Sequence, residues 1–405
     1  MGLVRASLTL LAGGVAAQAL PLALGPALTR LYPPAEYGRY AVFAAVAANI
    51  AVVACARFEF ALPLARGEAE ARHLMGLCLR VLVAVAAATV LAVLVGVAAG
   101  LAATWLWLPL AVAVAGALQW LTLWATRNER FAALSASRFT QYGGAALVQL
   151  AAGLVLPVMV GLVLGPIVAG AVALAWLRRP APAGGWKALW RTRRSDWMAA
   201  ARQHRDFPLF NTPHAFAGAL QDTLAVITVA ALAGAASAGY WGLALRYIKA
   251  PASLVGGAVS QALYPRLVEA TGAEAQAALR RVMLTLAAIA LPLTLALMLF
   301  GPALFALAFG ERWRAAGELA RALAPYIGVH FVAAPLAVVT LAWRAQAWAL
   351  KLALAGQVAF IAALGLGLHW GGLIGGAWAV SAAMVVYFGS YFWTLVHWRH
   401  DVGDA

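Results

Sequence analysis

The sequence predicts an all-α polytopic membrane protein with about twelve transmembrane helices in two six-helix bundles. Hydrophobic residues make up 64% of the 405 residues and charged residues only 11%, with a mean hydropathy of +0.86. A soluble domain carries about 25% charged residues. Apolar runs of roughly 20 residues, long enough to span a bilayer as helices, recur along the whole chain. Elements of the first half also recur in the second half in the same order.

The apolar runs give the individual spans. We predict them at residues 8–29, 40–56, 74–98, 104–124, 133–155, 158–177, 208–233, 239–263, 282–308, 319–341, 347–369 and 372–396. The 38 glycines fit this class because small residues let membrane helices approach closely. Cys55 and Cys78 both lie in or beside apolar runs, which does not favour a disulfide scaffold.

The basic residues predict the orientation. Of the 29 Lys and Arg residues, 22 lie in or near the loops on one side of this topology, 5 lie in or near those on the other side, and 2, Arg246 and Lys249, are assigned to a span. Basic loops stay in the cytoplasm, so both termini are predicted to be cytoplasmic. The net charge of +15 then reflects these loops and not a nucleic-acid-binding surface.

A polar stretch divides the spans into two sets of six. It separates an N-terminal lobe (residues 1–177) from a C-terminal lobe with a short cytoplasmic tail (residues 208–405), and residues 178–207 form a cytoplasmic basic linker. Its Pro/Gly-rich start and its basic, Trp-bearing body indicate an amphipathic segment on the inner membrane surface. A binding surface for a partner protein is the alternative.

The two sets resemble each other. "PAEYGRYAVF" after the first span is similar to "ASAGYWGLAL" after the seventh, and Gly38 aligns with Gly239. Further along, Pro63 aligns with Pro265, and "ATRNERFAAL" with "LAWRAQAWAL", which pairs Arg127 with Arg344. Equivalent elements are six helices apart, so both copies have the same orientation. This is a parallel pseudo-two-fold repeat, from which alternating-access transporters are built.

Arg246 and Lys249 carry charge inside the eighth predicted span. A charge at mid-membrane costs at least about 2.5 kcal/mol on insertion scales. At spacing i, i+3 the two side chains share one helix face, so they can line one cavity and bind one anion. Alternatively, the helix lies shallow and both side chains reach the interface. Pro251 would allow the helix to bend where such a cavity opens.

Four further polar residues are candidates. Asp222 and His214 lie in the seventh span, where a buried carboxylate has a raised pKa and can couple transport to an ion. The alternative for Asp222 is an ion pair with the cations of the eighth span. Arg57 and Glu59, at the end of the second span, stand two positions apart and would not face each other on a continuing helix. We expect Glu59 to hold a cation from elsewhere and Arg57 to face a cavity; an interfacial pair is the alternative.

The sequence contains no metal-ligand spacing, phosphate loop or nucleotide motif, so we expect neither a cofactor, a metal nor an enzymatic activity. Five stretches are informative when taken together: "LTRLYPPAEYGRYAVFAAV", "RFEFALPLARGEAEA", "TRNERFAALSASR", "FPLFNTPHAFAGALQDTLAVIT" and "GYWGLALRYIKAPASLVGGAVSQALYPRL". In this order they resemble Wzx-type polysaccharide flippases of the multidrug/oligosaccharidyl-lipid/polysaccharide exporter superfamily.

The resemblance implies two bundles around a central cavity that faces each side of the bacterial inner membrane in turn. It implies an undecaprenyl-pyrophosphate-linked oligosaccharide as substrate, moved for polysaccharide or lipopolysaccharide O-antigen biosynthesis alongside other glycan assembly proteins. Arg246, Lys249 and Arg57 would then bind the pyrophosphate. Three alternatives stay open: a multidrug/cation antiporter of the same fold, a membrane-embedded polysaccharide polymerase or ligase, and a non-transporting scaffold.

The charge distribution leads to a topology prediction. Reporter enzymes fused at the C-terminus and in the linker (residues 178–207) should show cytoplasmic activity, because both sites lie on the predicted basic side. A fusion in the loop after the first span, near residue 33, should show periplasmic activity. A periplasmic C-terminus would contradict the twelve-span topology.

Overall fold

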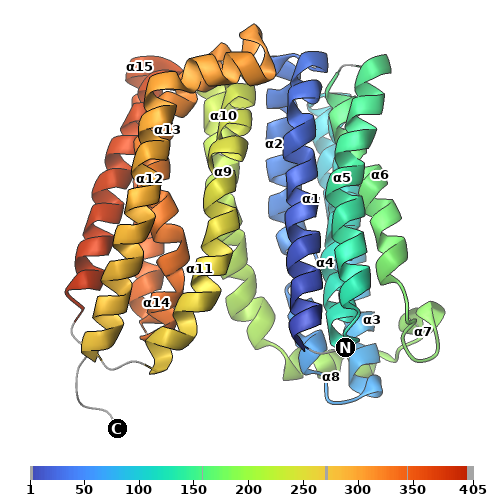
Figure 1. Cartoon of the computed structure of the whole chain (residues 1–405). Helices are drawn as coiled ribbons and strands as arrows, with labels where there is room; N and C mark the ends of the chain where they lie inside the picture. The colour runs from blue at the N-terminus through green and yellow to red at the C-terminus, as the bar shows by residue number, and fades with distance from the viewer. Residues whose placement is uncertain (1–2, 157, 270–271, 344, 399–405) are drawn as a thin grey trace. The chain divides into compact units, whose positions relative to one another are not determined.

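The computed structural model describes residues 3–156, 158–269, 272–343 and 345–398, and all regular structure in these ranges is helical (Figure 1). The chain divides into two compact units, Met1–Thr223 and Leu224–Ala405. This division falls within one helix, α9. The lobe boundaries at residues 177 and 208 stay a prediction.

Unit 1 contains six long helices and a group of short ones. They are α1 (Leu3–Leu31), α2 (Pro34–Val52), the 3₁₀ helix η1 (Phe58–Leu64), α3 (Glu68–Ala98), the short η2 (Ala103–Trp107), α4 (Leu108–Arg127), α5 (Phe131–Val155), α6 (Met159–Leu177), α7 (Trp186–Trp190), α8 (Arg194–Gln203), the π-helical η3 (Phe207–Asn211) and the first part of α9 (Thr212–Ala233). The segments η1, α7 and α8 lie at one end of the unit, which we call the linker end (Figure 1).

Unit 2 begins within α9. It continues with α10 (Ala235–Ile248), α11 (Ala250–Glu269), α12 (Gly272–Phe309), η4 (Glu311–Trp313), α13 (Arg314–Ala333), η5 (Ala334–Leu336), α14 (Ala337–Ala342) and α15 (Gln346–Val396). The last helix is two helices joined at a kink, where Gly372 has φ 60° and ψ −156°. Glycine tolerates this conformation because it has no Cβ.

In the described part of the chain, each predicted span corresponds to a helical segment. The break between the last two, predicted after residue 369, lies at Gly371 and Gly372. Some boundaries were wrong: the second span was predicted at 40–56, but α2 begins at Pro34 and ends at Val52. Arg344, paired with Arg127 in the repeat, lies outside the described residues. The predicted fold class of about twelve helices is confirmed.

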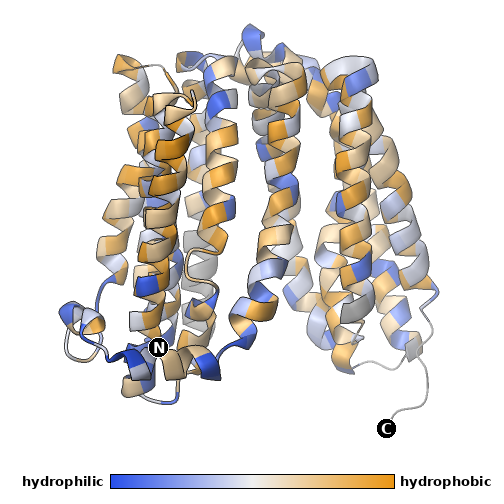
Figure 2. Ribbon diagram, turned by 180° about the vertical axis from the view of Figure 1, so that it is seen from behind, coloured by the Kyte–Doolittle hydropathy of each residue, from blue (hydrophilic) through white to orange (hydrophobic). Residues whose placement is uncertain are grey.

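Lipid is the main solvent of these helices. Among the described residues, seven segments are long and apolar enough to cross a membrane, and one of these, residues 348–396, contains both halves of α15. Large apolar side chains such as Leu154, Leu307 and Val386 are exposed along the helices. In unit 1, hydrophilic residues gather most densely at the linker end (Figure 2). The chain is therefore a multi-pass membrane protein.

Arg80 attaches the linker to α3. Its guanidinium group donates to the carbonyl oxygens of Leu189 at 3.0 Å, Trp190 at 3.0 Å and Thr192 at 3.2 Å, and to Gly76 within its own helix at 2.9 Å. The carbonyls at the end of α7 have no helical N–H partner, so a charged donor satisfies them. In the sequence, Arg80 is recognisable only as one of the 22 basic residues on the predicted cytoplasmic side.

Two neighbours on α3 complete the attachment. The carboxylate of Glu70 accepts from Gln203 Nε2 at 2.9 Å and lies 3.1 Å from His204 Nε2, at the end of α8. Gly76 allows the close approach, since a Cβ there would lie 3.0 Å from Thr192 Oγ1 and 3.2 Å from the Leu189 carbonyl oxygen.

Other arginines close helical ends in the same way. Arg127 donates to the carbonyl oxygens of Ala65 at 2.5 Å and Leu62 at 3.4 Å, where η1 ends, and lies 3.4 Å from the carboxylate of Glu68. Arg130 donates to the carbonyl oxygens of Trp176, at 3.2 Å, and Arg179 at the end of α6. The linker end of unit 1 is thus held by guanidinium–carbonyl hydrogen bonds.

We predict that Arg80→Ala destabilises unit 1. A hydrogen bond from a charged group contributes about 1.5–3 kcal/mol, so loss of this set should lower the free energy of unfolding by about 3 kcal/mol. The purified variant should melt at a lower temperature and be cleaved faster by protease within residues 186–203. Arg138→Ala, which removes an exposed arginine of α5 in the same unit, is the control. Equal behaviour of the two variants would contradict the role given to Arg80.

Candidate functional site

The connection between α2 and η1 contains strained backbone. Ala56 and Arg57 have φ angles of 48° and 62°, in the left-handed region. This conformation costs roughly 1–2 kcal/mol for a residue with a Cβ. It ends the helix, so α2 does not continue through Arg57 and Glu59, and the spacing argument for a continuing helix does not apply to them. The turn returns the chain toward the core, where η1 begins at Phe58.

Arg57 and Glu59 have different surroundings. The Arg57 guanidinium lies over the ring of Phe60, with 4.1 Å between the guanidinium carbon and the ring centroid. The side chain is half-buried, and its Nε has no hydrogen-bond partner. Glu59 is 1% exposed and its Oε2 has no partner. Within the described residues the two side chains form no ion pair, and no cation from another helix reaches Glu59.

Glu59 instead lies in an apolar cluster. Its buried neighbours in this part of unit 1 include Cys55, Phe58, Leu62 and Cys78. Burial raises the pKa of Glu59 to about 7, against a weaker opposing influence of its own backbone amide and of Arg57. A carboxyl group in this position can hold a proton near neutral pH. The backbone of η1 that carries it is fixed at its end by Arg127.

Arg246 and Lys249 lie where α10 meets α11. The helical backbone runs through Lys249, whose N–H donates to the Leu245 carbonyl oxygen at 3.0 Å. Pro251 has no N–H to continue the ladder, so the helix divides there into α10 and α11 as expected. Arg246 is exposed and Lys249 half-buried.

The two cations face away from the interior of unit 2. Tyr247, Ile248 and Pro251 line an apolar cavity of about 290 Å³ together with residues of α12 and α13. At about 100° per residue, Arg246 and Lys249 lie on the opposite side of the helix. The structure therefore keeps both charges on one side, away from this apolar cavity.

His214 and Asp222 lie on the first part of α9. This part packs on α2: Thr223 Oγ1 donates to the Ala45 carbonyl oxygen at 3.2 Å, and Asn49 Nδ2 donates to the Phe216 carbonyl oxygen at 3.4 Å. Asn49 is buried, and no sequence pattern predicted its polar contact with α9.

The side chains of His214 and Asp222 are exposed. The expectation of a buried Asp222 was wrong, because Thr223 and not Asp222 faces α2. An ion pair between Asp222 and the cations of α10 stays a prediction, since these residues belong to different units.

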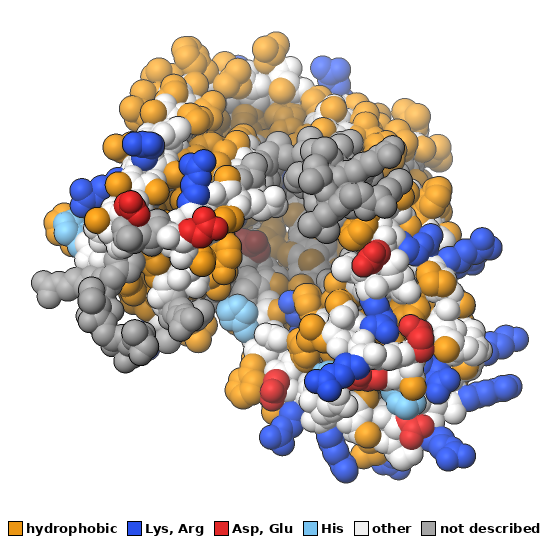
Figure 3. Space-filling model, turned by 60° about the horizontal axis from the view of Figure 1, so that its bottom comes forward, with side chains coloured by type: hydrophobic (Ala, Val, Ile, Leu, Met, Phe, Trp, Pro, Cys, Tyr) orange, Lys and Arg blue, Asp and Glu red, His pale blue; other side chains and the backbone are white. Residues whose placement is uncertain are grey.

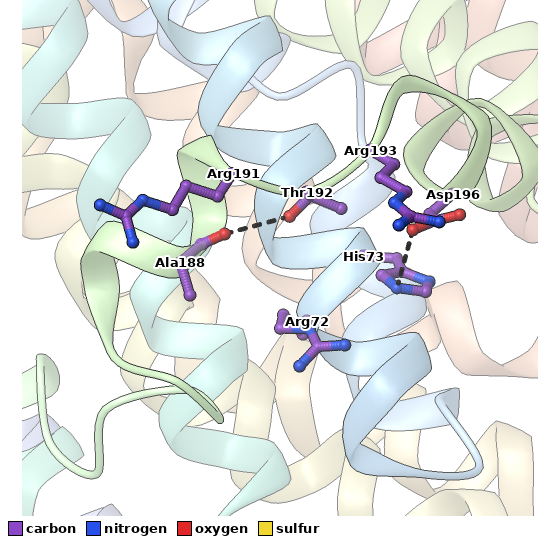
Figure 4. Close-up of a pocket in the computed structure, with 7 residues that line it drawn as sticks. All are labelled: Arg72, His73, Ala188, Arg191, Thr192, Arg193 and Asp196. Carbon is purple, nitrogen blue, oxygen red and sulfur yellow. Dashed lines mark hydrogen bonds and ion pairs between the residues drawn. The ribbon is translucent and has the colours of Figure 1, made fainter.

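A basic cavity at the linker end was not predicted. It has a volume of about 310 Å³ and opens between the start of α3 and the linker (Figure 4). Its lining residues are Arg72, His73, Ala188, Arg191, Thr192, Arg193 and Asp196. His73 Nε2 lies 3.8 Å from Asp196 Oδ2. The clustering of arginines in the linker was the available signal, but the contribution of α3 appears only in the fold.

In the space-filling view, Lys and Arg side chains gather at the linker end of unit 1 (Figure 3). Within the described residues, no group of three His, Cys, Asp or Glu side chains is placed to hold a metal ion.

Comparison with known proteins identifies relatives of this chain. The family model of polysaccharide biosynthesis proteins matches residues 27–318. Among curated protein sequences, no relative is found.

Similar solved structures include a lipid II flippase, MurJ, in an inward closed conformation: 11% identity, 96% of this chain and 88% of that chain covered, TM-score 0.66. The Vibrio cholerae MATE transporter VcmN in its bent form has 15% identity, coverage of 97% and 95%, and a TM-score of 0.53. A MOP superfamily transporter from Pyrococcus furiosus has 15% identity, coverage of 97% and 94%, and a TM-score of 0.53. At these identities the similarity establishes the fold.

Proposed function

Because the chain belongs to the polysaccharide biosynthesis protein family, we propose that it is a flippase for an undecaprenyl-pyrophosphate-linked oligosaccharide. It moves this lipid from the inner to the outer leaflet of the bacterial inner membrane for polysaccharide or O-antigen synthesis. The observation that carries the proposal is the family match over most of the chain, on a fold similar to that of a lipid II flippase.

The proposed mechanism is alternating access of a central cavity, without covalent chemistry. Arg246 and Lys249 bind the pyrophosphate. Their placement on the side of α10 opposite the apolar cavity of unit 2 supports this role, because two charges facing lipid would be unfavourable. Arg57 contributes a planar donor that can bind two phosphate oxygens at once.

We propose that Glu59, Asp222 or His214 couples transport to an ion. Glu59 has the stronger structural support, since its carboxyl group is buried with an unpartnered oxygen. Burial favours the protonated form of this group. A flippase driven by protons would alternate between the protonated and ionised forms of such a carboxyl.

A multidrug/cation antiporter is the second candidate, because MATE transporters share the fold. A cationic substrate would be bound by carboxylates. Here the proposed binding residues are mostly basic, and Glu59, the one buried carboxylate among the described residues, lies beside an apolar cluster. The charge of these residues therefore favours an anionic lipid over a cationic drug.

A transport assay separates the two candidates. The purified chain is reconstituted in liposomes that contain a fluorescent undecaprenyl-pyrophosphate oligosaccharide, and its movement between leaflets is followed with a membrane-impermeant quencher. The flippase proposal expects protein-dependent movement of this lipid and no uptake of ethidium under a proton gradient. Ethidium transport without lipid movement would establish the antiporter instead.

We predict that the double variant Arg246→Ala/Lys249→Ala abolishes lipid movement while the protein level and melting temperature stay unchanged. One exposed and one half-buried cation are lost, and with them the proposed pyrophosphate contact. Arg280→Ala/Arg281→Ala removes the same charge from exposed positions in unit 2 and serves as the control. Full activity of the first double variant would exclude these cations as the phosphate site.

We also predict that Arg57→Lys lowers the transport rate about tenfold, although it keeps the charge, since stacking and bidentate binding together contribute roughly 1–2 kcal/mol. Arg57→Ala should be inactive. The left-handed backbone is equally strained for Arg, Lys and Ala, so these variants differ only in their side chains. Glu59→Gln keeps the shape of this side chain but removes its ionisable carboxyl group. It therefore tests the role of Glu59 separately from that of Arg57. Wild-type rates in Arg57→Lys would contradict a specific role for the guanidinium.

A further inference from the structure

The arginines at the linker end of unit 1 fall into two groups. Arg80, Arg127 and Arg130 each donate to backbone carbonyl oxygens. The guanidinium groups of Arg72 and Arg193, by contrast, make no hydrogen bond or ion pair within the described part of the chain, yet both residues line one cavity. The fold therefore brings together guanidinium groups that form no hydrogen bond within the described part of the protein.

The charge in this cavity is unbalanced. Arg72, Arg191 and Arg193 contribute three positive charges, and Asp196 contributes the single negative charge. Asp196 is already engaged, since it lies 3.8 Å from His73 Nε2 and accepts from Ser195 Oγ at 3.0 Å. Like charges held close together repel each other, and a bound anion would relieve that repulsion.

The arrangement suits a small oxyanion. In Figure 4, Arg193 lies beside the His73–Asp196 pair and Arg72 lies below it, whereas Arg191, at the other rim, extends away from them. A volume of about 310 Å³ accommodates a phosphate group with its attached chain. Arginine binds phosphate oxygens in a planar, bidentate manner, which Lys cannot do.

Aromatic residues place this cavity near the level of lipid headgroups. Trp190, at the end of α7, is 55% exposed, and the ring of Trp197 on α8 lies 5.6 Å from the Arg80 guanidinium carbon. Tryptophan concentrates at membrane–water interfaces. Basic segments beside a membrane attract anionic lipids by about 1 kcal/mol per charge.

We propose that the cavity between α3 and the linker binds a phosphate group through Arg72 and Arg193. The phosphate is that of an anionic membrane lipid or of a soluble phosphate compound. When bound, it bridges α3 and the linker, and so adds to the attachment made by Arg80 and Glu70. This site is independent of the transport proposed above.

The test compares two double variants of the full chain with the wild type. Arg72→Gln/Arg193→Gln removes two cations of the cavity. Lys187→Gln/Arg205→Gln removes two exposed cations of the linker that do not line it. Retention of phosphatidylglycerol is measured by native mass spectrometry after extraction from vesicles of phosphatidylglycerol and phosphatidylcholine. Hydrogen exchange of residues 186–203 is followed in phosphatidylcholine nanodiscs, with and without phosphatidylglycerol or inorganic phosphate.

We expect the cavity variant to bind phosphatidylglycerol at least tenfold more weakly than the wild type and the control variant. Phosphatidylglycerol should slow exchange of the linker in the wild type and the control only. Protection by inorganic phosphate without lipid retention would also support the site and identify a soluble ligand. Equal losses in both double variants, or no protection by either probe, would overturn the proposal. Unchanged melting temperatures show that the cavity variant is folded.

Discussion

The hydrogen bonds from arginine guanidinium groups to carbonyl oxygens at helical ends hold the linker end of unit 1 together. Each helix leaves its last carbonyls without an N–H partner, and an apolar surrounding makes such orphans costly. Arg127 satisfies those of η1, and Arg80 those of α7. The positions of Glu59 and of the basic cavity follow from these bonds. If η1 or α7 were released, neither arrangement would persist.

The same residue type serves two purposes in this small region. Arg80 is fixed by four acceptors on α3 and the linker, whereas Arg72, eight residues earlier on α3, lines a cavity beside other cations. The difference lies in the acceptors within reach and not in the side chain itself. The linker end of unit 1 therefore contains arginines that hold backbone carbonyls in place and arginines that line the cavity proposed to bind phosphate, and their partners distinguish the two.

Glu59, unlike Arg80, is buried without a partner for one of its side-chain oxygens. Its carboxyl group is buried in an apolar cluster behind a turn whose two residues, Ala56 and Arg57, adopt left-handed backbone conformations. Both features are unfavourable, and strained backbone of this kind concentrates at functional sites. Arg57 is turned onto Phe60 and does not neutralise Glu59. The turn thus leaves the side chains of Arg57 and Glu59, two positions apart in the sequence, without an ion pair, consistent with different roles in the proposed transport cycle.

The sequence by itself determined the number and type of the helices, because a span requires a local run of about 20 apolar residues and satisfies its own backbone hydrogen bonds. It also determined that Arg246 and Lys249 share a helix side and that Pro251 divides the helix, since both are local properties. It did not determine where α2 ends, the exposure of Asp222, or the partners of the arginines. Those depend on contacts between distant segments, as when Arg80 on α3 reaches carbonyls more than 100 residues further along the chain. Hydropathy carries no information about such pairs, so only the tertiary structure decided which cations are satisfied and which line a cavity.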